Sequence, residues 1–195
     1  KPNFIGCWDI ENKKLCNEIV YFFENNKELS KEGTTTLGKN IKAKKTTDIT
    51  ITPKDLENSK FEIFKKYFKE LHNCYMDYQK QWPFVKSIFN TVDIGVFNIQ
   101  KYNPGDHFSH LHCERTSLNS LHRLFAFMTY LNDVEDGGKT NFDYYGIKVK
   151  PEIGKTLIWP AEWTHAHTGE VLKSGTKYIV TGWLHFPVKE TKEHE

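Results

Sequence analysis

The sequence predicts an α+β protein, with a helical N-terminal part and a C-terminal part made of short strands. Up to about residue 90, apolar residues recur at helical spacing, whereas from Thr91 onward they alternate with polar residues. Many short strands with regular turns are typical of a sandwich or barrel. We therefore expect supporting helices and a loop in residues 1–90, the β core in residues 91–188 and a charged tail in residues 189–195, all within one compact domain.

The first predicted helix lies between Asn12 and Asn26, where apolar residues at i, i+4, i+7 and i+8 share one face. These residues are Leu15, Ile19, Phe22 and Phe23. The next stretch, Ser30–Thr50, holds glycines, three consecutive threonines and several lysines without a clear period. We expect a long loop there, with a short strand at Asp48–Ile51.

The second predicted helix begins with Thr52 as N-cap, Pro53 in the first helical position and Asp55 completing a capping-box-like pattern. Trp82-Pro83 ends it, because proline cannot continue a helix without losing a hydrogen bond. Its apolar face would hold Phe61, Phe64, Phe68, Leu71, Tyr75 and Tyr78.

The predicted strands are short apolar runs bounded by turn residues. Val92, Ile94 and Val96 alternate with a polar residue or glycine, as expected of the first strand of the core. The further runs are Leu124–Leu131, Ile147–Val149, Thr156–Trp159 and Tyr178–Leu184.

The composition narrows the functional classes. Hydrophobic residues make up 38% of the chain and aromatic residues 14%, enough for a packed core and unlike a disordered protein. The net charge of +2 gives no argument for a nucleic-acid or membrane partner, and no apolar run approaches a membrane span of about 20 residues. The four cysteines form no framework, so we expect free thiols and a cytoplasmic protein.

Histidines cluster in two short segments, and one of them contains His112-Cys113-Glu114. On a strand, residues i and i+2 face the same side, so His112 and Glu114 would present an imidazole and a carboxylate together. A distant third ligand would complete a 2-His-1-carboxylate triad, the iron site of non-haem oxygenases. A lone His-x-Glu is a weak signal of a metal site. His110 and His165 are alternative ligands. If they are not ligands, they are partners of the ligands, substrate contacts or plain surface residues.

Further motifs accompany this pair in a fixed order. They are Tyr102-Asn103-Pro104-Gly105, Arg123 seven residues before Tyr130-Leu131-Asn132, Gly137-Gly138-x-Thr140-x-Phe142, Pro151-x-x-Gly154, and finally His167, Val171, Gly175, Lys177 and Trp183. In this order the segment resembles the prolyl 4-hydroxylase-like branch of the 2-oxoglutarate/Fe(II) dioxygenases. The resemblance covers a little under half of the chain.

This resemblance implies a double-stranded β-helix, the cupin-like jelly roll, with Fe(II), 2-oxoglutarate and O₂ as its cofactors and ascorbate to keep the iron reduced. It makes His112, Glu114 and His167 the metal ligands and catalytic residues. Lys177 would bind the far carboxylate of 2-oxoglutarate, since a buried carboxylate needs a cation. Tyr130 and Thr181 would support that carboxylate, and Tyr102 would line the same cavity.

The implied reaction is hydroxylation coupled to decarboxylation of 2-oxoglutarate to succinate, with peptidyl proline in a peptide or protein as the leading substrate. Trp82, Trp159, Trp163 and the Ser30–Thr50 loop would form an aromatic and basic groove for it. A free amino acid or other small molecule is the alternative substrate. The runs Tyr130–Gly138 and Trp159–His165 also resemble small stand-alone oxygenases of marine bacteriophages, which would place the protein in an infected cell.

One departure from the family pattern is Glu114, which stands where relatives have Asp. Glutamate is a competent ligand, but it is longer by one methylene. Two other classes stay open: a cupin-like metal enzyme that does not use 2-oxoglutarate and needs no Lys177, and a binding module that has lost turnover.

Overall fold

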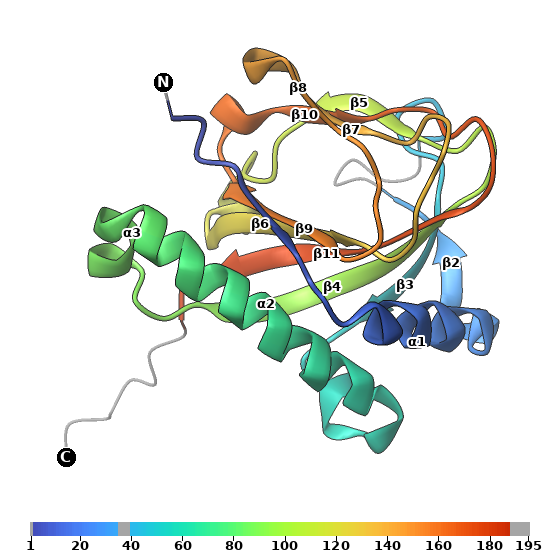
Figure 1. Cartoon of the computed structure of the whole chain (residues 1–195), viewed down its shortest axis with the longest axis horizontal. Coiled ribbons are helices and arrows are strands. Elements are labelled where there is room, and N and C mark those ends of the chain that lie inside the picture. The colour runs from blue at the N-terminus through green and yellow to red at the C-terminus, as the bar shows by residue number, and fades with distance from the viewer. Residues whose placement is uncertain (1, 35–39, 188–195) are drawn as a thin grey trace.

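The structure is a computed structural model that describes residues 2–34 and 40–187; the predicted tail, residues 189–195, lies outside this range. Within the described residues, two antiparallel sheets face each other, and helices cover the outer face of the larger sheet (Figure 1). The larger sheet has the order β1-β9-β6-β11-β4-β3-β2, and the smaller one has the order β5-β10-β7-β8. This is the jelly roll that the sequence predicts.

The elements follow in a simple chain order. The helices are α1 (Lys13–Glu24), α2 (Glu62–Gln81) and α3 (Pro83–Ile88). The strands of the larger sheet are β1 (Gly6–Asp9), β2 (Ser30–Glu32), β3 (Thr47–Ile51), β4 (Asp93–Tyr102), β6 (Arg123–Tyr130), β9 (Lys155–Pro160) and β11 (Lys177–His185). Those of the smaller sheet are β5 (Phe108–His112), β7 (Thr140–Phe142), β8 (Ile147–Val149) and β10 (His167–Gly169).

The first helix agrees with its prediction. Asn12 caps it by accepting a hydrogen bond from the backbone N–H of Leu15 at 3.1 Å. Leu15, Ile19, Phe22 and Phe23 are all buried against the sheet, as their spacing predicts.

The start of the second helix was predicted wrongly. Thr52 and Asp55 do cap each other, with the N–H of Thr52 donating to Asp55 at 2.7 Å. However, this cap opens two short 3₁₀ turns, and the α-helix begins only at Glu62. Pro83 ends α2 as expected and then opens α3, because a proline is well accommodated in the first helical turn.

The N-terminal part is less purely helical than predicted. β1 pairs with β9, and β2 and β3 extend the larger sheet beyond β4. The stretch Ser30–Glu32 is therefore a strand within the expected loop, whereas the strand predicted at Asp48–Ile51 is present and begins at Thr47. The division of the chain near residue 90 stays a prediction.

Side chains along the strands of the larger sheet alternate between its two faces and so pack in two separate cores. In β11, Tyr178, Val180 and Leu184 pack with the helices, whereas Ile179 and Trp183 pack between the two sheets. One side of this sheet therefore holds the helices, and the other side is free to hold a site.

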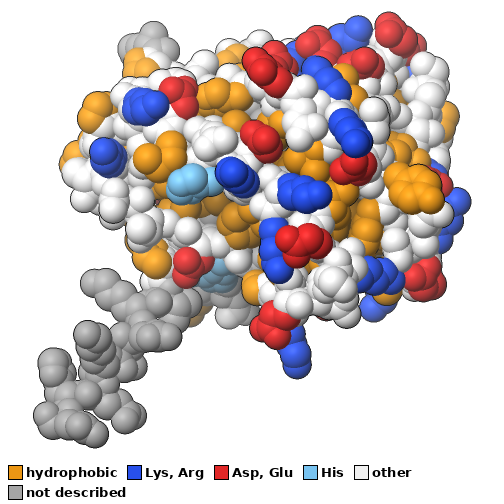
Figure 2. All heavy atoms as spheres, turned by 60° about the horizontal axis from the view of Figure 1, so that its bottom comes forward, with side chains coloured by type: hydrophobic (Ala, Val, Ile, Leu, Met, Phe, Trp, Pro, Cys, Tyr) orange, Lys and Arg blue, Asp and Glu red, His pale blue; other side chains and the backbone are white. Residues whose placement is uncertain are grey.

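The surface and the thiols agree with the composition. Acidic and basic side chains are interspersed on the face that Figure 2 brings forward. All four cysteines are free, as expected. Among the described residues, no helix combines the length and the apolar character that a bilayer crossing requires.

Candidate active site

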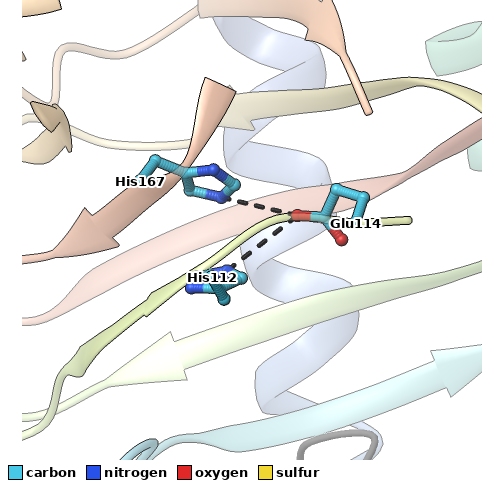
Figure 3. Close-up of side chains that lie close together, drawn as sticks. All are labelled: His112, Glu114 and His167. Carbon is cyan, nitrogen blue, oxygen red and sulfur yellow. Dashed lines mark ion pairs between the residues drawn. The ribbon is translucent and has the colours of Figure 1, made fainter. Parts of the chain in front are cut away.

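The structure brings the three predicted metal ligands together. One ligand atom from each of His112, Glu114 and His167 lies within 4.8 Å of the others. His112 ends β5 and His167 opens β10, and the pairing of these strands sets the two histidines opposite each other (Figure 3). Glu114 differs from the prediction, since β5 ends at His112 and the carboxylate comes from the loop that follows.

Both imidazoles are oriented by backbone carbonyl groups. Nδ1 of His112 lies 2.8 Å from the carbonyl oxygen of His110, and Nδ1 of His167 lies 3.0 Å from that of His165. Because a carbonyl oxygen only accepts hydrogen bonds, each Nδ1 carries the proton. Each Nε2 is then left with a lone pair, which is the arrangement that a metal-binding histidine needs.

The carboxylate of Glu114 faces both of these nitrogens. Its Oε1 lies 3.4 Å from Nε2 of His167 and 3.9 Å from Nε2 of His112. Two imidazoles and one carboxylate suit Fe(II) and leave its remaining coordination positions open. The donor set therefore fits the metal.

Burial and neighbouring groups shift the pKa values of Glu114 and His112. Burial alone would raise the pKa of Glu114, but the imidazoles of His167 and His112 and the indole N–H of Trp183 lower it to about 2. Burial and the nearby His167 lower the pKa of His112 to about 4. Near neutral pH, Glu114 is ionised and His112 is neutral.

A cavity of about 1030 Å³ between the two sheets contains the triad. Its floor includes alternate residues of β11, namely Lys177, Ile179, Thr181 and Trp183. Trp159 and Phe142 surround the ring of His167, with centroids at 5.0 and 5.6 Å. The pocket therefore combines aromatic side chains around the triad with many polar and charged residues elsewhere in its lining.

Lys177 is a buried cation in this cavity. Its side chain is only 2% exposed, and Nζ donates to the carbonyl oxygen of Gly138 at 2.9 Å. Nζ also lies 3.9 Å from the ring centroid of Tyr102. Among the described residues it forms no salt bridge, and burial lowers its pKa to about 7.

Of the other residues predicted to bind or surround 2-oxoglutarate, Tyr102 and Thr181 line the cavity, whereas Tyr130 does not. Tyr102 lines it, but its hydroxyl donates to Gln100 at 2.8 Å, so its ring face is what it offers to Lys177. Tyr130 is fully buried and is not part of the lining; its hydroxyl donates to Thr140 at 2.7 Å. Thr181 lines the cavity, and its hydroxyl donates to the carbonyl oxygen of Phe127.

Thr140 is a cavity residue to which sequence reasoning gave no role. Its hydroxyl accepts the hydrogen bond of Tyr130, and Thr140 lines the cavity whereas Tyr130 does not. The signal was present, since Thr140 belongs to the Gly137-Gly138-x-Thr140 motif.

The competing histidines lie outside the cluster of ligand atoms. His110 lines the cavity with an exposed side chain, and its carbonyl group orients His112. His165 is buried, and its Nε2 lies 2.8 Å from the carbonyl oxygen of Asn3 in the N-terminal segment. Both residues therefore act on the ligands through their backbone.

The three tryptophans of the predicted groove are separated. Trp82 packs against Tyr78, at 4.4 Å between ring centroids, in the helical layer. Trp159 is buried beside His167, and Trp163 is 65% exposed where it lines the cavity. Only the last two belong to the cavity.

Comparison with known sequences shows a similarity over the segment that forms this cavity. The model of the 2OG-Fe(II) oxygenase superfamily matches residues 97–185, the segment that contains the triad and Lys177. The prolyl 4-hydroxylase subunit alpha-2 of Gallus gallus is 27% identical over 92 residues, which are 44% of this chain and 17% of the relative. The probable prolyl 4-hydroxylase 9 of Arabidopsis thaliana is 29% identical over 114 residues, 45% of this chain and 40% of the relative. The chain thus spans well under half the length of these relatives.

Solved structures share the fold over nearly the whole chain. The viral collagen prolyl hydroxylase of Paramecium Bursaria Chlorella virus-1 has a TM-score of 0.68 and 16% identity, covering 94% of this chain and 97% of its own. The prolyl hydroxylase of Trichoplax adhaerens, solved with a hypoxia inducible factor peptide, has a TM-score of 0.72 and 13% identity, covering 94% and 84%. In sequence over residues 97–185, and in fold over nearly the whole chain, the protein is thus similar to prolyl 4-hydroxylase-like 2OG-Fe(II) oxygenases.

Proposed function

We propose that this chain is an Fe(II)- and 2-oxoglutarate-dependent dioxygenase that hydroxylates peptidyl proline. The observation that supports this most strongly is the shared cavity of the triad and Lys177. A buried lysine without a carboxylate partner is costly, and an anionic cosubstrate would offset that cost.

In this proposal His112, Glu114 and His167 hold the iron, and Lys177 pairs with the far carboxylate of 2-oxoglutarate. Bound Fe(II), 2-oxoglutarate and O₂ supply the oxidising chemistry, in which 2-oxoglutarate becomes succinate and CO₂ and the substrate gains a hydroxyl group. The carbonyl groups of His110 and His165 keep both imidazoles in the binding tautomer.

Two exposed aromatic side chains support a peptide substrate. Tyr144 and Trp163 are 62% and 65% exposed, line the same cavity and pack edge to face with centroids 6.3 Å apart. Such aromatic surfaces pack well against proline-rich extended chains. A free amino acid would fit deeper in the cavity and would not need this pair.

The direct test is succinate formation with Fe(II), 2-oxoglutarate and proline-containing peptides, with hydroxyproline identified by mass spectrometry. Lys177→Ala should abolish 2-oxoglutarate binding. An active Lys177→Ala variant with unchanged 2-oxoglutarate affinity would instead indicate a metal enzyme that does not use this cosubstrate.

Trp163→Ala separates the substrate classes. It should raise KM for a peptide at least about tenfold while leaving the KM for 2-oxoglutarate unchanged. Turnover of free proline that is unaffected by this substitution would favour a small-molecule hydroxylase.

A further inference from the structure

The two oxygens of the Glu114 carboxylate have different environments. Oε1 faces the Nε2 atoms of His167 and His112, at 3.4 and 3.9 Å. Oε2 points away from them and accepts a hydrogen bond from the indole N–H of Trp183 at 2.6 Å. A short bond from a neutral donor to a carboxylate is a strong one, so it fixes which oxygen faces the histidines.

The indole is itself held rigidly. Trp183 lies on β11 and pairs with Ala126 of β6, while on the side of β4 the strand register shifts at this residue. The guanidinium of Arg123 stacks on the indole ring at 3.6 Å, and the same guanidinium donates to the backbone carbonyl of Glu114 at 3.0 Å. Trp183 and Arg123 therefore fix both the side chain and the backbone of Glu114.

This support matters because Glu114 lies beyond the end of β5. Its N–H donates to the carbonyl oxygen of Ala161 at 3.2 Å, but no strand pairing continues through it. A glutamate side chain also has one more rotatable bond than an aspartate side chain. Without an external contact, its carboxylate would be free to turn and offer both oxygens to a metal ion.

We propose that Trp183 is a positioning residue that makes Glu114 a one-oxygen ligand. The indole occupies Oε2, so only Oε1 is available to the cation, and the position that a second oxygen would take is left free for cosubstrate. In this way the indole compensates for the extra length of glutamate. The inference rests on the proposed metal site.

The test is metal affinity, which needs no turnover. Mn(II) binding would be measured by electron paramagnetic resonance of the free ion in wild-type protein and in Trp183→Phe, which keeps an aromatic ring for Arg123 but lacks the N–H. We expect binding to weaken about 10- to 100-fold, as is typical when a partner of a metal ligand is removed. Trp163→Phe is the matched control, because Trp163 lines the same cavity without touching Glu114; its affinity should equal that of wild type.

Repeating the Trp183→Phe substitution in a Glu114→Asp variant distinguishes positioning of Glu114 from general support of the fold. In Glu114→Asp the shorter side chain cannot span both the histidines and the indole. Adding Trp183→Phe to this variant should then change Mn(II) affinity less than about twofold. An equal loss in both backgrounds would show that Trp183 merely supports the fold and would overturn the proposal.

The wild-type protein provides a test that does not depend on any variant folding. A crystal structure with Mn(II) should show Glu114 bound through Oε1 alone, with Oε2 still bonded to Trp183. Coordination through both oxygens would overturn the inference while leaving the proposed function intact. Failure of wild-type protein to bind Mn(II) at this site would refute both.

Discussion

At the scale of single residues, Glu114 tests the metal site most directly. Glu114→Ala removes the only carboxylate of the metal-binding cluster found among the described residues. We expect Mn(II) binding to weaken more than about 100-fold and 2-oxoglutarate turnover to be lost, because two imidazoles alone bind a hard cation poorly. Calorimetric titration with Mn(II) measures the first effect and succinate release the second. Full activity in this variant would remove Glu114 from the ligand set.

Lys177 predicts the pH dependence of cosubstrate binding. Burial lowers its pKa to about 7 in the free protein, whereas a bound carboxylate would raise it. The lysine is therefore half charged at about pH 7 and almost fully charged one unit below, so 2-oxoglutarate affinity should fall as pH rises above about 7, by up to tenfold per unit. Calorimetry between about pH 6 and 9 would measure this, together with proton uptake on binding. Lys177→Arg, which stays charged throughout, is the control, and equal affinity for wild type across the range would contradict the prediction.

The sequence was most informative about individual site residues, for a physical reason. Strand alternation places Lys177 and Thr181 on one face, and the structure has both lining the cavity. The hydroxyl of Tyr130 was harder to predict, since its direction depends on Thr140, which comes from a different sheet. The partner of Oε2 of Glu114 was likewise invisible, because Trp183 is 69 residues away in sequence.

At the scale of elements, strand pairing explains structure that the local sequence pattern does not predict. Residues 30–32 have no strong strand pattern and become a strand only because β3 provides a partner. The capping signal at Thr52 and Asp55 was real, but a cap specifies only that a turn starts there. The α-helix begins later, at the residue after Phe61, where apolar residues can reach the core.

The turn before β9 carries an element-scale prediction about stability. Gly154 has φ +88°, and a Cβ built on it would lie 2.4 Å from the carbonyl oxygen of Ile10, whose N–H donates to Gly154. Gly175 has a similar φ of +71° but open space around it. Gly154→Ala and Gly175→Ala share the backbone penalty of about 1 kcal/mol, and only the first adds a clash. We expect Gly154→Ala to be less stable than Gly175→Ala by about 1–3 kcal/mol in urea unfolding; equal stability would show that the Ile10 segment moves away.

At the scale of the whole molecule, one face of the larger sheet packs in the core with the helices and the other face contributes to the candidate site. Its outer face packs on the helices, and its inner face lines the cavity. Phe64 on α2 is fully buried in the outer core, 5.1 Å from Phe22 and 5.3 Å from Phe97 between ring centroids. No described residue of α2 lines the cavity. A defect on one face should therefore be separable from a defect on the other.

Phe64→Ala tests this separation. A cavity left by a buried phenylalanine costs about 3–5 kcal/mol, which corresponds to a fall in Tm of about 6–20 °C for a chain of this size. Mn(II) affinity, measured well below the lowered Tm, should stay within about twofold of wild type, because the proposed metal ligands lie on the other side of the sheet. Phe84→Ala, at a position 74% exposed on α3, is the control and should change neither Tm nor affinity. Weakened metal binding in a folded Phe64→Ala protein would instead mean that the helical layer positions the triad through the strands between them.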